Sequence, residues 1–118
     1  MTPSDRRAVV LQRVASYICK DRQKNYGDAE DNFATIAQFW NVWGERRGLL
    51  KAGQSFTRLD VCEMMSLVKT ARKVANLHYQ DNWDDAVGYQ AIGAAIAAEE
   101  RNELPTVTND EEPSQTKR

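Results

Sequence analysis

The sequence predicts an all-α protein of four principal helices, and three observations carry this prediction. Apolar residues recur at spacings of three and four along most of the chain, as they do on one face of a helix. No segment shows the alternating β-branched residues that mark a strand. The 118 residues suffice for one domain with a single core. We therefore expect a helical domain over residues 1–103 and, because it is polar and contains two prolines, a disordered tail over 104–118.

The first two helices are separated by a polar segment. The first is expected from Ser4, as its N-cap, to Asp21, with an apolar face formed by Val10, Leu11, Val14, Tyr17 and Ile18. Gly27 then interrupts the pattern. The second helix is expected from about Asp28 to Gly44, with a buried stripe of Phe33, Ile36, Ala37, Trp40 and Trp43.

The last two helices are expected to form an antiparallel hairpin, because only a short turn near residues 76–80 separates them. Thr57 followed by Asp60 is a capping box with a short acid and marks the start of the third helix. Its expected buried face is Val61, Met64, Met65, Val68, Ala71 and Ala75. The fourth helix is expected from Asp81 to Asn102, with Ala86, Val87, Tyr89, Ala94, Ile96 and Ala97 facing inward.

Composition excludes several classes of function. A formal net charge of −1 with scattered basic residues provides no drive toward nucleic acid or an anionic membrane. No apolar run approaches the ~18 residues of a membrane span, and the first residues do not resemble a signal peptide. Cys19 and Cys62 lack metal-site spacing, and we interpret both as buried thiols. These features predict a cytoplasmic protein.

The charged residues of the last two predicted helices form the most specific chemical pattern. Asp60 and Glu63 lie three residues apart, and Asn82 and Asp85 repeat this spacing, so each pair shares one helix face. Side-chain oxygens of these types are the ligands that Mg²⁺ prefers. The hairpin would bring a group of cations opposite Asp85, namely Lys69, Arg72 and Lys73. A metal beside such cations is the arrangement that a polyphosphate requires.

Structural explanations compete with the metal site. An antiparallel hairpin separates the two acidic pairs, so a site that uses all four side chains requires offset helices or a second subunit. Asp60 and Glu63 are also explained as a solvated helix face. Asp85 is also explained by a salt bridge to Lys69 or Arg72, because a partly buried carboxylate requires a cation or a metal.

Other polar and aromatic residues have equally plain explanations. Asp81 and Asp84 are expected to cap the fourth helix, and His78 is interpreted as a turn residue bonded to a carboxylate. The tryptophans Trp40, Trp43 and Trp83 are expected in the core, although a tryptophan beside a cleft can stack on a base. Tyr26 belongs to a polar loop.

Three segments resemble a small phage and prophage family over roughly residues 25–95. They are NYGDAEDNFATIAQFW, DVCEMMSLVKTARK and HYQDNWDDAVGYQAIG. This family is in turn similar to the MazG-like all-α nucleoside triphosphate pyrophosphohydrolases, whose helices bind Mg²⁺ through E-x-x-E and then E-x-x-D. The corresponding residues here are Asp60, Glu63, Asn82 and Asp85, so Asp60 and Asn82 each replace a glutamate. The resemblance implies a MazG-like bundle whose sites are completed in a homodimer or higher homo-oligomer.

The resemblance also implies an activity. Mg²⁺-assisted attack of water on the α–β phosphate bond of an NTP or dNTP would release a monophosphate and pyrophosphate. Glu63 and Asp85 would then be the catalytic metal ligands, and Asp60 and Asn82 would complete the metal site. The nucleotide would be bound by Lys69, Arg72, Lys73, Tyr26 and Trp83.

Asn82 favours a second hypothesis, because the loss of a carboxylate weakens metal binding. In that hypothesis the protein binds or sequesters a nucleotide without hydrolysing it. A third hypothesis is a helical phage protein that acts on a host protein without any ligand.

Overall fold

The computed structural model describes residues 1–21 and 27–102, and those residues contain helices and no strand. The α-helices are α1 (Pro3–Ser16), α3 (Ala29–Arg46), α4 (Arg58–Ala75) and α5 (Gln80–Glu100). α1 continues into a π-helical turn, η1 (Tyr17–Asp21). The prediction of four principal helices is therefore confirmed, while the predicted tail lies outside the described residues.

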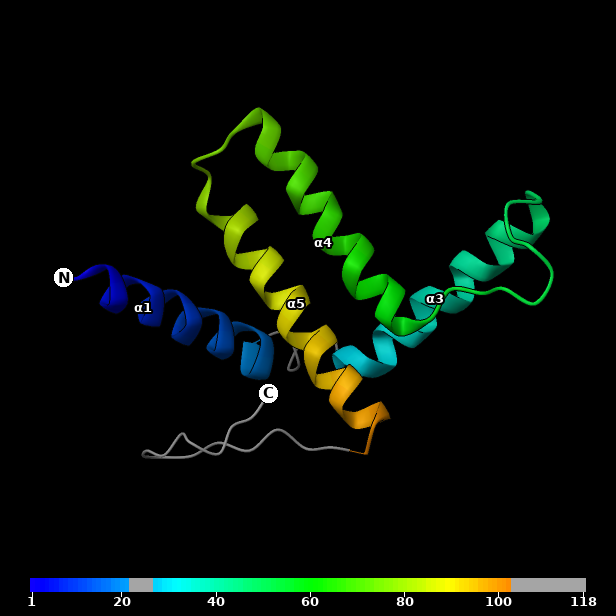
Figure 1. The fold of residues 1–118 in the computed structure, drawn as a ribbon, viewed down its shortest axis with the longest axis horizontal. Helices are drawn as coiled ribbons and strands as arrows, with labels where there is room; N and C mark the ends of the chain where they lie inside the picture. Colours follow the sequence, from blue (N-terminus) through cyan, green and yellow to red (C-terminus); the bar gives the residue numbers. More distant parts are fainter. Residues whose placement is uncertain (22–26, 103–118) are drawn as a thin grey trace.

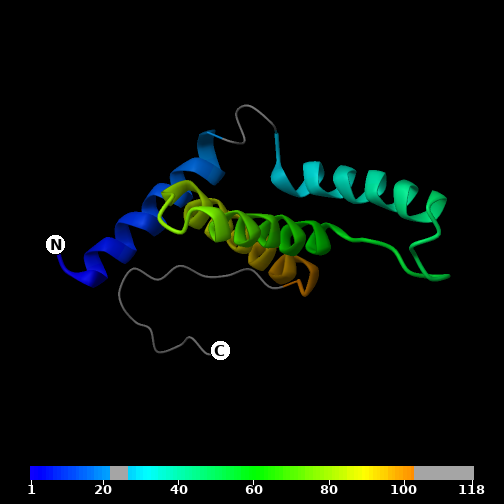
Figure 2. The same cartoon turned by 90° about the horizontal axis from the view of Figure 1, so that it is seen from above.

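α4 and α5 form an antiparallel hairpin at the centre of the molecule (Figure 1). α1 packs against α5. α3 crosses the open end of the hairpin, away from the turn that joins α4 and α5, and contacts both of these helices there. The two views agree that the C-terminal half of α3 extends beyond the hairpin, together with the loop that leads into α4 (Figure 2). Each outer helix is consequently supported along only part of its length.

The start of α1 differs from the prediction. Thr2, not Ser4, is the N-cap, and its hydroxyl accepts a hydrogen bond from the backbone N–H of Asp5. The Asp5 carboxylate in turn accepts from the N–H of Thr2 at 2.9 Å, which completes a capping box. Pro3 explains the shift, since proline is favoured at the first helical position, where no N–H is needed.

The helices of the hairpin begin in different ways. The predicted capping box of Thr57 and Asp60 is confirmed at the start of α4. The prediction that Asp81 and Asp84 cap α5 is wrong, because Tyr79 is the N-cap and no side chain bonds to the free N–H groups. Asp81 still lies in the first turn, where a negative charge suits the helix dipole.

The core lies where α3, α4 and α5 cross. Its buried side chains come in pairs from the three helices: Phe33 and Ala37, Val61 and Cys62, Ile92 and Ile96. Burial raises the pKa of the Cys62 thiol to about 11, and the nearby negative charge of Glu30 adds to this effect. The prediction of a buried thiol is confirmed for Cys62 and wrong for Cys19, which is exposed.

The predicted buried faces are only partly correct. On α4, Met64 and Val68 are 39% and 41% exposed, and Ser66 is buried in their place. Trp43 on α3 is 65% exposed, and Ala94 on α5 is exposed. Apolar residues occupy more than one face of α4, and periodicity alone does not indicate which of these faces another helix covers.

Gly93 permits the close approach of α4 and α5. A β-carbon at this position would lie 3.2 Å from the β-carbon of Cys62, which is fixed to the α4 backbone and cannot rotate away. We expect Gly93→Val to lower the free energy of unfolding by about 1–2 kcal/mol, because overpacking would force the helices apart. Urea unfolding tests this expectation, with Ala94→Val at the next, exposed position as the control for β-branching. Equal losses in both variants would contradict it.

Candidate functional site

A polar cleft lies where α1 and η1 meet the hairpin, and we call it the α1–α5 cleft. It contains a cavity of about 220 Å³ lined by Tyr17, Ile18, Lys69, Asp84, Asp85, Gly88, Tyr89 and Ile92. A neighbouring cavity of about 210 Å³ shares Tyr17, Asp84 and Asp85 with the first and is completed by Arg13, Val14 and Asp81. Each cavity alone is smaller than the roughly 300–1,000 Å³ typical of ligand sites, but the shared residues place the two side by side.

The first ion pair of the cleft joins the two helices of the hairpin. The ammonium group of Lys69 lies 3.0 Å from the carboxylate of Asp85, and the Lys69 side chain is only 13% exposed. The salt bridge considered for Asp85 from the sequence is thus present. A charge pair in this partly buried setting interacts more strongly than one in water, but each partner has lost part of its hydration.

The second ion pair ties α1 to α5. The Arg13 guanidinium donates to both carboxylate oxygens of Asp84, at 2.9 and 3.4 Å, and the amide of Gln80 donates to the same carboxylate at 2.9 Å. Burial acts to raise the pKa of Asp84, but the hydrogen bonds from Arg13 and Gln80 outweigh it and lower the pKa below 3.8. The same pairing raises the pKa of Arg13.

The lowered pKa of Asp84 predicts a pH dependence. Its contribution to stability is complete above the pKa of the unfolded chain and is lost as pH falls through the lower pKa of the folded chain. We expect the urea midpoint of the wild type to fall more steeply below about pH 4 than that of Asp84→Asn. Asp5→Asn, which removes an acid whose pKa is also lowered but which lies at the start of α1 and does not line the cleft, is the comparison. Parallel curves for wild type and Asp84→Asn would contradict the pairing.

The aromatic side chains of the cleft come from η1 and α5. Tyr17 is 48% exposed at the first position of η1, and π-helical turns occur frequently at functional sites. Tyr89 is held from behind by Phe33, with ring centroids 6.0 Å apart. Sequence reasoning did not select Arg13 or Tyr17 as site residues. Their spacing of four places them on one face of α1 and its continuation into η1, but only the fold shows that Asp84, 71 residues from Arg13, lies opposite.

The four predicted metal ligands do not form one site in the single chain. The carboxylate of Asp60 accepts hydrogen bonds from the N–H and hydroxyl of Thr57, at 2.7 and 3.1 Å. Glu63 accepts instead from the amide of Gln90 at 2.9 Å. Among residues 1–21 and 27–102, no three His, Cys, Asp or Glu side chains lie close enough to hold a metal ion.

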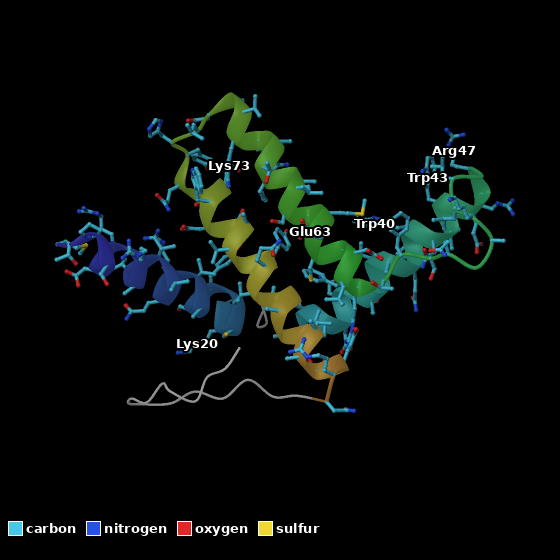
Figure 3. The ribbon with its side chains drawn as sticks, viewed as in Figure 1. Lys20, Trp40, Trp43, Arg47, Glu63 and Lys73 are labelled. Carbon is cyan, nitrogen blue, oxygen red and sulfur yellow. The ribbon has the colours of Figure 1, made fainter. Side chains whose placement is uncertain are left out.

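The pairing of the hairpin explains this separation. Glu63 lies opposite Gln90, whereas Asp85 lies opposite Lys69. Gln90 and Asp85 are five residues apart on α5, a rise of roughly 7 Å, which exceeds the distance between two ligands of one Mg²⁺ ion. The single chain therefore does not fit the predicted metal. Figure 3 labels Glu63, which lies in the N-terminal third of α4, and Lys73 near the C-terminal end of that helix.

Asn82 is buried, at 6% exposure, one turn before Asp85 on α5. Its backbone N–H donates to the carbonyl of Tyr79. Its side-chain amide makes no hydrogen bond to any residue in the described part of the chain. Buried polar groups are usually paired, so this amide is an exception within the hairpin.

The remaining predicted binding residues lie near the turn of the hairpin. Lys73 lies over the ring of Trp83, 3.7 Å from its centroid, while the indole N–H donates to the carbonyl of Leu77 at 2.7 Å. Trp83 is 45% exposed and lines neither cavity of the cleft, so the core prediction for it is wrong. Arg72 is exposed on the same part of α4.

Two further predicted residues have simpler outcomes. His78 is exposed in the turn, as predicted, but the hydrogen bond to a carboxylate is not found among the described residues. Tyr26 lies outside the residues that the structure describes.

The fold and the cleft define a class, a small all-α protein built on a helical hairpin with paired charges at the contact with its first helix. The chain belongs to the family described as a domain of unknown function, DUF6378, whose model matches residues 9–97. No solved structure matches the chain. Within the described residues no helix is long and apolar enough to cross a membrane.

Two relatives are phage proteins, which confirms the predicted resemblance to a phage family. The chain is 36% identical over 83 residues to the Gene 55 protein of Mycobacterium phage L5, covering 70% of this chain and 49% of the relative. It is 29% identical over 80 residues to the Gene 55 protein of Mycobacterium phage D29, covering 68% and 48%. The chain thus spans about half the length of these relatives. The similarity to the pyrophosphohydrolases stays a prediction.

Proposed function

We propose that this protein binds a nucleoside phosphate in the α1–α5 cleft. The observation that carries the proposal is the Lys69–Asp85 ion pair in the cleft wall, where a partly buried ammonium group borders a cavity. A phosphate oxygen can replace the Asp85 carboxylate as the partner of Lys69, since both are anionic acceptors of similar geometry.

The other groups of the cleft suit the remaining parts of such a ligand. Arg13 lines the neighbouring cavity, and its planar guanidinium can hold a second phosphate through two parallel hydrogen bonds. Tyr17 and Tyr89 provide aromatic surface against which a base can stack. Asp81, Asp84 and Asp85 add negative charge to the same walls, which favours a phosphate that arrives with a bound divalent cation.

Binding, rather than hydrolysis, is the function that the single chain supports. Catalysis by the predicted mechanism needs a metal held by Asp60, Glu63, Asn82 and Asp85. The carboxylates of Asp60, Glu63 and Asp85 are instead bonded to three different residues, namely Thr57, Gln90 and Lys69. Pyrophosphohydrolase activity with Mg²⁺ therefore stays a prediction. It requires either a rearrangement of α4 and α5 or a metal site shared between two subunits. Action in the host cytoplasm and a role in phage nucleotide metabolism are proposals of the same kind.

The test is calorimetric titration of the full chain with a panel of NTPs and dNTPs, with and without Mg²⁺. We expect saturable binding and a rise of several degrees in Tm at saturation. Lys69→Met should weaken the affinity at least roughly tenfold, because it removes the charge that faces the phosphate. Lys51→Met is the matched control, since Lys51 is exposed in the loop between α3 and α4.

Each outcome separates the hypotheses. Binding that is lost in Lys69→Met without release of pyrophosphate supports the proposal. Release of pyrophosphate from an NTP, abolished in Asp85→Ala, would establish the enzyme instead. Absence of binding by every nucleotide, with and without Mg²⁺, would overturn the proposal and favour a protein that acts only on other proteins.

A further inference from the structure

An apolar pocket lies between α3, the loop that follows it and α4, and we call it the α3 pocket. It has a volume of about 240 Å³ and shares no lining residue with the α1–α5 cleft. Two of its walls are open to solvent, because Trp43 on α3 and Leu49 in the loop are 65% and 66% exposed. Figure 3 shows Trp40 and Trp43 on the part of α3 that extends beyond the hairpin. The side chains that line the pocket are apolar or aromatic: Trp40, Trp43, Leu49, Leu50, Phe56 and Met64.

Contacts within the chain hold the walls of the α3 pocket in place. The Asn41 amide bonds to both backbone groups of Phe56, accepting from its N–H at 2.6 Å and donating to its carbonyl at 3.1 Å. The Phe56 ring meets the Trp40 ring edge to face, with centroids 5.7 Å apart. Gly44 leaves room for Leu50, since a β-carbon at Gly44 would lie 2.9 Å from Cγ of Leu50. A ligand therefore avoids the cost of ordering the pocket.

The size of the α3 pocket indicates what occupies it. Pockets for small molecules usually measure roughly 300–1,000 Å³, which is larger than this one. An apolar cavity of about 150 Å³ already holds a benzene molecule. The α3 pocket, at about 240 Å³, thus suits one large apolar side chain. Protein interfaces derive most of their affinity from a few such anchors, and tryptophan and arginine are enriched around them.

The α3 side of the pocket is basic. Arg46 and Arg47 follow Trp43 by three and four residues, which places them beside it on one face of the last helical turn. Glu45, two residues after Trp43, lies on another face. Both arginines are exposed and form no salt bridge in the described part of the chain. Cations suit the C-terminal end of a helix, but these guanidinium groups remain open to a carboxylate from outside.

We propose that the α3 pocket binds a short acidic segment of another protein. One large apolar side chain of the segment enters the pocket, and carboxylates beside it pair with Arg46 and Arg47. The buried anchor supplies most of the affinity, while the charges select acidic partners and speed their encounter. On the α4 side, the carboxylates of Asp60 and Glu63 already accept hydrogen bonds from Thr57 and Gln90.

Selection of short peptides from a random display library on the full chain tests the proposal. We expect the enriched peptides to share a leucine, phenylalanine or tryptophan with an aspartate or glutamate within about four residues of it. As synthetic peptides they should bind with a Kd on the order of 1–100 µM, measured by fluorescence anisotropy. Their affinity should fall as the salt concentration rises. Failure to enrich any sequence above an unrelated helical protein would overturn the proposal.

Substitutions at exposed leucines show whether the peptides use the pocket. Leu49→Ala should weaken peptide binding at least roughly tenfold, because it removes one wall of the pocket. Leu77→Ala is the matched control, since Leu77 is similarly exposed, at 57%, in the turn between α4 and α5. This control should change the affinity by less than about twofold. Equal losses in the two variants would contradict binding in the α3 pocket.

Charge reversal gives a readout that a misfolded variant cannot produce. Arg46→Glu combined with Arg47→Glu should select basic peptides from the same library instead of acidic ones. Selection of acidic peptides by both proteins would contradict the role of the arginines. Displacement of the peptides by self-association of the chain, seen in sedimentation equilibrium, would assign the pocket to a second copy and overturn the proposal. These readouts need no nucleotide, so they are independent of the proposed function.

Discussion

Replacing Phe33 by alanine is expected to lower the free energy of unfolding by about 3–5 kcal/mol. Phe33 is 1% exposed and belongs to the core where α3 crosses the hairpin. Truncation removes its transfer free energy and leaves a cavity that three helices cannot easily close. Because the Phe33 ring also packs against Tyr89, we expect the Tyr89 side chain in the wall of the α1–α5 cleft to become more mobile as well.

Urea unfolding at one fixed protein concentration measures this loss, since association would otherwise contribute to the apparent stability. Val74→Ala is the control, because Val74 is 89% exposed and its truncation should change stability by no more than about 0.5 kcal/mol. Similar losses in the two variants would show that the packing of α3 on the hairpin is not as described.

Replacing Asn82 by leucine is expected to have the opposite sign and to raise the free energy of unfolding by about 1–2 kcal/mol. The two side chains have the same number of heavy atoms with the same branching, and the buried amide makes no side-chain hydrogen bond to the described residues. Removal of a buried polar group without a partner relieves its desolvation penalty.

The same variant shows whether Asn82 serves a ligand. If its amide is retained for binding, Asn82→Leu should be more stable than the wild type but should bind nucleotide at least roughly tenfold more weakly. Asn82→Asp places a carboxylate where the pyrophosphohydrolase pattern has one, and we expect it to be destabilised because the charge is buried. A loss of stability in Asn82→Leu would indicate that the amide has a partner in the folded protein.

The elements of the hairpin show how far local sequence reasoning extends. The capping box of Thr57 and Asp60 could be predicted, because all of its hydrogen bonds lie within three residues. The start of α5 could not, because the helix already begins at Gln80, and Asp84, inside it, is paired with Arg13. That pairing depends on a residue 71 positions away, which no local pattern contains.

The candidate site shows the same division. The opposition of Asp85 and Lys69 followed from the prediction of an antiparallel hairpin, and so did the separation of Asp60 and Glu63 from Asn82 and Asp85. Arg13 and Tyr17 were missed, because their role depends on where α1 packs. The exposure of Met64, Trp43 and Cys19 was also missed, because periodicity identifies apolar faces without identifying their neighbours.

By itself, the sequence determined the helices of this protein, most of their boundaries and the antiparallel pairing of the last two, since these follow from periodicity, capping and loop length. Only the tertiary structure decided which charges meet in the α1–α5 cleft and which apolar face remains uncovered. The physical reason is that helix formation depends on neighbours three or four residues apart, whereas burial and ion pairing depend on residues that the crossing of helices brings together.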